Sequence, residues 1–413
     1  MVKKRWLIEE AIPVLYARAL ERAWGGERSR LGLDNWDPAV PLPKGPLSVP
    51  VDRAGVKVVG GQSLQHAICD QAEEYDARQL DLELKALPRL RIRGVTMPDP
   101  RLAAWMEHDK VSATFAYDYP HGFYLPSSDL FKEMFADHFG IRSPVAERIG
   151  VGAPLQSARN NLRNPPTVDE WGFSLSALVC QGDDWRTQHD ECLTVLTTDV
   201  KRAGIVGSAE VGGLFADLLP AAQHGRARRD GVRPDLRLLH DGRYYLYDLK
   251  TVRFISAYYT QARVVGPHAD RAAPVEHRAE LVHEEYAKAI AKLDATFSSH
   301  IVDPSARPLT RRLNEHPRVV GLAFGQFGGV SKAVHTLLKE TANAAAFKHW
   351  RQAGAKSPQA AVSGYVSTYR RRWGGIARMA AARLKLARAQ WAGRGAPDPS
   401  APGRVGLRPY FTC

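Results

Sequence analysis

The sequence has no hydrophobic run long enough to cross a membrane. A membrane-spanning helix needs about 20 consecutive apolar residues, and no stretch of these 413 residues approaches that length. The basic start of the chain is interrupted by Glu9, Glu10, Arg18 and Arg22, which indicates an amphipathic helix rather than a signal peptide. We therefore expect an intracellular protein, in the nucleus or the cytoplasm, without a membrane partner.

Cysteine is also scarce. The four cysteines are Cys69, Cys180, Cys192 and Cys413, and none belongs to a CxxC pair, so a disulfide framework is excluded. Cys180, His189 and Cys192 lie close enough in sequence to suggest a zinc site. However, no fourth ligand is evident, and the spacing fits no standard zinc finger. Buried or helical thiols are the favoured interpretation.

Acidic residues are almost missing from the C-terminal part of the chain. From position 331 to the end there are 15 Lys and Arg, against Glu340 and Asp398 alone. The residues before position 331 hold 42 charges of each sign, so the last fifth of the chain accounts for the whole net charge of +13. This distribution is typical of a segment that binds a polyanion.

The order of hydrophobic patterns indicates an α/β (α+β) fold. A helix near 187–204 is followed by strands near 205–211, 234–240 and 244–252, a helix over 274–297 and a buried strand over 318–325. Further helices are expected over 1–30, 127–138, 331–351 and 357–391, the last one kinked or broken at Gly374 and Gly375.

The same patterns divide the chain into five parts. They are an N-terminal helix and proline-rich linker (1–50), a mixed region of unknown role (51–185), an α/β core (186–326), basic helices (327–392) and a disordered tail (393–413). The tail is rich in glycine and proline, which favours disorder.

The strands at 234–240 and 244–252 are joined by Asp241 and Gly242, a strong signal for a two-residue hairpin turn. This turn fixes a register in which paired residue numbers sum to 483. Asp235 then lies directly opposite Asp248, with Cβ atoms about 5 Å apart. Lys250 follows two residues later and shares that face. The other, core-facing side is expected to carry Leu236, Leu238, Tyr245, Tyr247 and Leu249.

Two carboxylates directly opposite each other in a sheet repel, so a compensating charge is expected. A divalent cation such as Mg²⁺ (or Mn²⁺) would supply it, because Mg²⁺ binds one or two carboxylates and keeps several waters. Such a metal can polarise a phosphodiester and activate a bound water. Lys250 could then orient that water or stabilise the developing negative charge. The hairpin therefore predicts a metal-dependent hydrolytic site.

The two motifs resemble a known signature. Arg-Pro-Asp at 233–235 and Asp-Leu-Lys at 248–250, separated by twelve residues, resemble the motif of the PD-(D/E)xK, or restriction-endonuclease-like, nuclease superfamily. The element order over 186–326 resembles that superfamily's core, a central mixed sheet flanked by helices. The resemblance implies a Mg²⁺-dependent phosphodiesterase that cleaves nucleic acid, with DNA as the expected substrate.

The resemblance also implies a set of metal ligands. The metal would be held by Asp235, Asp248 and the carbonyl of Leu249, and in many members an acidic residue on the first helix completes the site. Glu191 fits that place, and Glu210 near the first strand is its competitor. Residues 168–204 also resemble regions that follow reverse transcriptases in some protist and algal retroelements, which would make the chain a product of a mobile element.

Two alternatives do without catalysis. In the first, the hairpin is structural, Asp235 pairs with Arg233 or Arg237, and Lys250 bridges both carboxylates. In the second, a nuclease-like fold of a mobile element or virus has lost its activity and only binds nucleic acid. Tyr286 is expected in the core, because it falls on an apolar helical stripe. His189 could act near the site, but a helix cap or a position in solvent is the favoured interpretation.

The basic helices predict the surface that binds nucleic acid. Basic residues would neutralise phosphates, and the aromatic residues between them could stack on unpaired bases. A homodimer is possible. The residues expected to form this surface are Tyr365, Tyr369, Arg370, Arg371, Arg372, Trp373, Arg378, Arg383, Lys385 and Arg388.

Overall fold

The computed structural model consists of two compact units, Met1–Leu87 and Pro88–Cys413, and each is considered by itself. It describes residues 80–92, 95–111, 126–155, 166–177, 184–209, 214–215, 217–218, 233–240, 242–254, 257–260, 273–297 and 307–389. The expected N-terminal helix and linker, Cys69, Cys180, Glu210 and the tail after 392 lie outside these ranges. No helix within them is long and apolar enough to span a membrane.

A four-stranded mixed sheet forms the centre of the second unit. Its order is β3 (Gly207–Ala209), β4 (Leu236–His240), β5 (Arg243–Val252) and β6 (Val320–Gly325). The first two pairings are antiparallel, and β5 runs parallel to β6. The mixed α/β fold class and all four strands are therefore confirmed.

The register of the hairpin is also confirmed. Leu236 pairs with Tyr247 and His240 pairs with Arg243, so partner numbers sum to 483 as predicted. Gly242 has a φ of 76°, which a two-residue hairpin turn requires and glycine adopts without strain.

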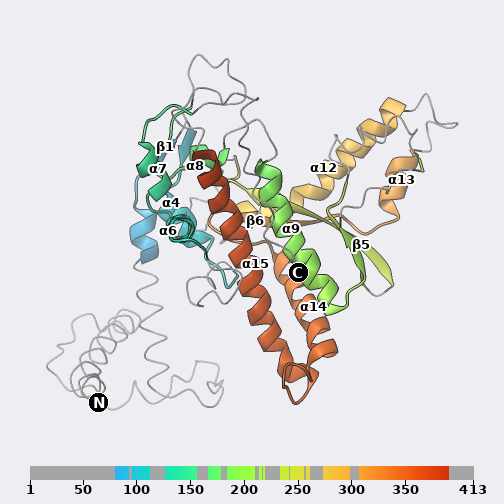
Figure 1. The fold of residues 1–413 in the computed structure, drawn as a ribbon. Coiled ribbons are helices and arrows are strands. Elements are labelled where there is room, and N and C mark those ends of the chain that lie inside the picture. Colours follow the sequence, from blue (N-terminus) through green and yellow to red (C-terminus); the bar gives the residue numbers. More distant parts are fainter. Residues whose placement is uncertain are drawn as a thin grey trace, which may run out of the picture. The chain divides into compact units, whose positions relative to one another are not determined.

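Helices cover both faces of the sheet (Figure 1). On one face, α9 (Asp184–Ala203), α14 (Lys332–His349) and α15 (Pro358–Ala389) pack on Leu236, Leu238, Tyr247 and Leu249. On the other, α12 (Ala273–Phe297) and α13 (Pro308–Asn314) pack around Leu246. The expected boundaries at 185/186 and 326/327 thus fall inside one compact unit.

Shorter elements complete this unit, among them α4 (Pro100–Met106) and α6 (Ser128–Phe139). Ser127 caps α6 through a hydrogen bond to the Leu130 N–H at 3.3 Å, as its sequence predicts. The N-terminus of α6 is thereby fixed where the helix packs on α4 and α15. The other short elements of this unit are β1 (Leu90–Ile92), β2 (Val95–Met97), α7 (Pro144–Ile149), α8 (Phe173–Ala177) and α11 (Ala257–Thr260).

The expected break at Gly374 and Gly375 does not occur, because α15 is continuous over 32 residues. Gly374 has a different role. A Cβ at this position would overlap the carbonyl oxygen of Val111, whereas a Cβ on Gly375 would meet nothing within 4 Å. The first glycine permits close packing of α15 on the Val111 backbone, and the second only weakens the helix.

This difference gives a matched pair of variants. Gly374→Ala should lower the free energy of unfolding by about 1–3 kcal/mol, the usual cost of overpacking. Gly375→Ala should raise it by about 0.5–1 kcal/mol, because alanine favours the helix interior. Denaturant unfolding of the two variants measures both effects, and equal shifts in the same direction would contradict this role for Gly374.

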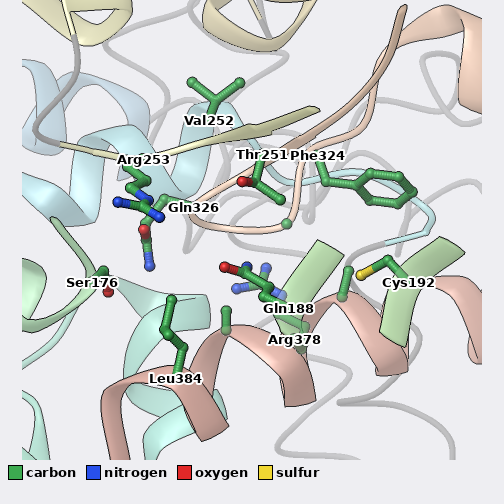
Figure 2. Close-up of a pocket in the computed structure, with 14 residues that line it drawn as sticks. Ser176, Gln188, Cys192, Thr251, Val252, Arg253, Phe324, Gln326, Arg378 and Leu384 are labelled. Carbon is green, nitrogen blue, oxygen red and sulfur yellow. The ribbon is translucent and has the colours of Figure 1, made fainter. Parts of the chain in front are cut away.

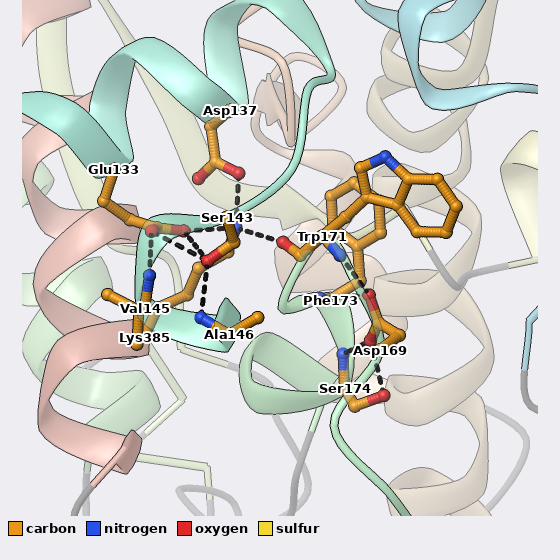
Figure 3. Close-up of polar contacts among 10 residues, drawn as sticks. All are labelled: Glu133, Asp137, Ser143, Val145, Ala146, Asp169, Trp171, Phe173, Ser174 and Lys385. Carbon is orange, nitrogen blue, oxygen red and sulfur yellow. Dashed lines mark hydrogen bonds and ion pairs between the residues drawn. The ribbon is translucent and has the colours of Figure 1, made fainter. Parts of the chain in front are cut away.

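The basic residues of α15 are mostly not at the surface, which corrects the expectation from its composition. Trp373 is fully buried, Arg378 and Arg388 are 2% exposed and Lys385 is 0% exposed. Lys385 donates to Glu133 at 2.9 Å and to the Trp171 carbonyl at 2.9 Å, and it also contacts Asp137 (Figure 3). These four residues do not form an exposed nucleic-acid surface, because α15 packs there on α6, α8 and α9.

The other basic side chains of α15 are half-buried. Arg372 pairs with Asp199 at 2.9 Å, and the Trp373 indole N–H donates to the same carboxylate at 3.0 Å. Arg370 and Arg371 remain candidates for contact with nucleic acid, since both are partly exposed.

Candidate active site

The site lies where β5 extends beyond its partner strand. The β4–β5 ladder ends at Leu236 and Tyr247, so Asp235 and Asp248 face each other one step past the last pair. The Leu249 N–H donates to the Asp235 side-chain Oδ2 at 2.6 Å. Asp235 is therefore fixed against β5 by its side chain.

His189 of α9 reaches the same carboxylate. Its Nε2 lies 3.0 Å from Asp235 Oδ2, and its Nδ1 lies 3.1 Å from Asp190 Oδ1. Burial lowers the pKa of His189, but the bonds to both carboxylates outweigh it and raise the pKa to about 9. Burial also raises the pKa of Asp235. The hydrogen bond and the charge of His189 outweigh burial, so the pKa of Asp235 lies below its usual value. The pair is therefore charged at neutral pH.

His189 was expected at a cap or in solvent, and that expectation is wrong. The signal for its role was weak: it lies two residues before Glu191, and two residues turn a helix by about 200°. A helix that directs one of these side chains toward the hairpin directs the other away from it.

Asp248 is the more deeply buried carboxylate, with 3% exposure. The Tyr286 hydroxyl of α12 donates to its Oδ1 at 3.2 Å. The Lys250 ammonium forms an ion pair with Oδ2, although Oδ2 accepts no hydrogen bond of normal geometry. Burial raises the pKa of Asp248 to about 7, Asp235 adds to this rise, and Lys250 opposes it.

Tyr286 thus combines the expected core position with a polar contact. It is 3% exposed and packs with Val282 and Leu246, while its hydroxyl orients Asp248. Burial in this apolar environment raises its pKa, so the hydroxyl keeps its proton and acts as a donor.

Glu191 does not join the two aspartates. Both of its oxygens accept from Arg383 of α15 at 3.1 Å, because its side of α9 faces α15. The expectation that Glu191 completes the site is therefore corrected, and so is the exposed position expected for Arg383. The described residues contain no group of three or more His, Cys, Asp or Glu that could hold a metal.

The donors at this end of β5 nevertheless suit a hard divalent cation. Asp235 and Asp248 offer the carboxylate oxygens that Mg²⁺ prefers. The Leu249 N–H points toward Asp235, and the carbonyl of a strand residue points to the same edge as its N–H. Its partner in the extended register is Pro234, which has no N–H to donate to that carbonyl. Two carboxylates and one carbonyl are therefore available from adjacent positions.

The zinc alternative finds no support at Cys192. This thiol is buried at 1% exposure, and burial raises its pKa to about 12, so it stays protonated, whereas zinc binds the thiolate. The expected buried thiol is confirmed for Cys192.

The contact between His189 and Asp235 predicts a pH dependence of stability. Because the folded-state pKa of His189 is raised above 6.5, its stabilising effect is complete below pH 6.5 and is lost as pH rises through about 9. Between pH 7.5 and 9.5 the native protein should lose about 1–3 kcal/mol more unfolding free energy than His189→Asn. Denaturant unfolding at both pH values tests this, with His316→Asn as the control, and parallel curves for the native protein and His189→Asn would refute it.

Comparison with protein-family models, curated proteins and solved structures finds no match to this chain. The functional assignment therefore depends on the chemistry of the site.

Proposed function

We propose that the protein is a Mg²⁺-dependent nuclease that hydrolyses phosphodiester bonds, with DNA as its substrate. The observation that carries this proposal is the meeting of Asp235, Asp248 and Lys250 at the open end of β5. A buried and a half-buried carboxylate that face each other beside one lysine are unusual in a purely structural hairpin, because like charges opposite each other weaken a sheet.

Each residue has a definable role. Asp235, Asp248 and the Leu249 carbonyl would hold the metal, and the bound ion would supply Lewis-acid activation of a phosphodiester and of water. Lys250 sits beside Asp248, where its ammonium can stabilise negative charge on the phosphate. His189 and Tyr286 hold the two carboxylates in fixed orientations from opposite faces of the sheet.

The fold supports the same proposal. Helix α9, strands β3, β4 and β5, helix α12 and strand β6 follow one another in the order expected of a restriction-endonuclease-like core, with the short α11 and α13 added. We take residues 186–326 to be that core.

A second candidate is a protein that binds nucleic acid without cleaving it. One observation favours it: each carboxylate already has a cationic partner, His189 for Asp235 and Lys250 for Asp248. The site is therefore electrically balanced without a metal, and a lost activity would leave it stable.

Cleavage of supercoiled, linear and single-stranded DNA and of RNA separates the two candidates. A nuclease should cut in Mg²⁺ or Mn²⁺ and stop in EDTA. Salt-dependent binding without cleavage of any substrate would favour the second candidate.

A further inference from the structure

A small polar pocket lies at the carboxyl ends of β5 and β6, between these strands and helices α8, α9 and α15 (Figure 2). Its cavity volume, counted as positions open to the centre of a water molecule, is about 20 Å³. One water needs about 10–15 Å³ on this measure. The pocket thus has room for a compact polar group and excludes a large ring.

The side chains that line the pocket select for negative charge. Arg253 and Arg378 contribute guanidinium groups, and none of the 14 described lining residues is acidic. Guanidinium groups bind the oxygens of a phosphate with matching geometry. The other polar residues of the lining, which can all donate hydrogen bonds, are Ser176, Gln188, Thr251 and Gln326.

The Ser176 hydroxyl is an independent sign of a ligand. Ser176 is 5% exposed, and its buried Oγ has no hydrogen-bond partner. Its backbone carbonyl is used, because Arg388 donates to it at 2.7 Å. A buried hydroxyl without a protein partner needs a hydrogen-bonding group, which a bound ligand or a water can supply.

Three carboxyl groups, those of Glu107, Asp109 and Asp137, lie behind the pocket wall and interact with the charge of Arg378. Glu107 sits against Gly325 and accepts from the N–H groups of Phe327 at 3.0 Å and Gly329 at 3.2 Å. Burial raises the pKa of Glu107 to about 8, so it is mostly neutral at pH 7. Glu107 therefore cancels little of the positive charge of the lining, and Asp109 and Asp137 offset part of the charge of Arg378.

The pocket adjoins the candidate active site. Thr251 follows Lys250 on β5, and Gln188 precedes His189 on α9. Successive strand residues point to opposite faces of the sheet, so Thr251 faces α9 and α15 whereas Lys250 faces α12. The pocket and the site come together through α9, because His189 reaches Asp235 from the pocket's side of the sheet.

We propose that this pocket binds a phosphate monoester. In the nuclease proposed above, on which this part depends, the occupant is the terminal phosphate of the nucleic-acid strand. An enclosed pocket suits a terminal group better than a diester that continues on both sides. The hydroxyl and amide donors of the lining can engage its oxygens beside the two guanidinium groups, of which Arg378 also contacts His138 at 2.9 Å. The enzyme would then act near strand ends.

Inorganic phosphate tests the pocket without any cleavage assay. Phosphate should raise the melting temperature of the full chain at pH 7, and chloride at equal ionic strength should not. The dissociation constant from calorimetry should rise about tenfold in Ser176→Ala, the loss of one hydrogen bond to a charged group. Arg253→Gln should weaken binding at least as much, and the exposed Arg351→Gln should not.

The stability of Ser176→Ala gives a second readout. Because the hydroxyl has no partner, its removal should leave the melting temperature without phosphate unchanged or slightly higher. Equal phosphate affinity of Ser176→Ala and the native chain, or equal stabilisation by phosphate and chloride, would overturn the pocket.

Oligonucleotides then test the occupant. With the Asp248→Asn chain, strands ending in a 5′- or 3′-phosphate should bind about tenfold more tightly than the same strands with hydroxyl ends, and Ser176→Ala should abolish this gain. If the chain binds inorganic phosphate but binds strands with phosphate ends no more tightly than strands with hydroxyl ends, the occupant is not the terminal phosphate of a nucleic acid. A chain that binds phosphate but never cleaves would overturn the nuclease alone.

Discussion

Asp248→Asn should reduce Mg²⁺-dependent cleavage by at least about 10³-fold while the protein stays folded. The change keeps the shape of the side chain and removes the charge that a divalent ion needs. It also removes repulsion with Asp235, and Asp248 has a pKa of about 7 in its buried position. The free energy of unfolding at pH 8 should therefore stay constant or increase. Initial rates on plasmid DNA in Mg²⁺ measure the loss.

Two further variants sharpen this result. Lys250→Met should lower cleavage by about 10²–10³-fold, the usual effect of removing one group that stabilises transition-state charge. Asp129→Asn is the matched control, because Asp129 forms an exposed ion pair with Arg148 at 2.9 Å and lies outside the hairpin. Undiminished cleavage by both Asp248→Asn and Lys250→Met would remove the hairpin from the mechanism.

Lys385→Met should lower the free energy of unfolding by about 3–5 kcal/mol, the range for breaking a buried ion pair. Lys385 and Glu133 are both 0% exposed, and Asp137 is 4% exposed (Figure 3). Ser143 donates to Glu133 at 2.8 Å, but no hydroxyl can replace a lost positive charge. The variant would leave two buried carboxylates without their cation. Denaturant unfolding measures the change.

The pH dependence of this variant identifies the cause. Burial raises the pKa of Asp137 to about 6, and Lys385 opposes that rise. Without Lys385 the folded-state pKa rises further, so the folded state takes up protons that the unfolded state does not. The stability of the variant should therefore fall as pH rises from 5.5 to 8. Lys348→Met, at an exposed position of α14, should show no such slope. If Lys385→Met is as stable as the native chain but binds DNA more weakly, Lys385 lies on a surface that binds nucleic acid, as the sequence predicted.

The hairpin could be predicted because its determinants are local. The Asp-Gly pair at 241–242 predicts the turn from sequence, and the predicted register holds for every pair out to Leu236 and Tyr247. The helix start at Ser127 was predictable for the same reason, since a capping residue acts within one turn.

The roles of α15 and α9 could not be predicted, because their determinants are distant in sequence. Lys385 finds its carboxylates 252 and 248 residues away, at Glu133 and Asp137. For this reason the basic residues of α15 were interpreted from the sequence as an exposed surface that binds nucleic acid. On α9, the choice between His189 and Glu191 depended on the rotation of the helix about its axis, which the hydrophobic pattern fixes too loosely to separate neighbouring turns.

The position of α15 has a consequence for how the chain acquires its structure. Its Trp373, Ile376 and Met379 share one core cluster with Leu236 of the sheet and Leu130 of α6, which precede them by more than a hundred residues. Contacts over such distances form slowly. During synthesis the sheet and α6 leave the ribosome well before α15 does. Until α15 has been synthesised, the apolar surface that it covers stays exposed. A truncation before residue 358 would leave that surface exposed permanently, and chaperones and proteases would recognise the chain as incomplete.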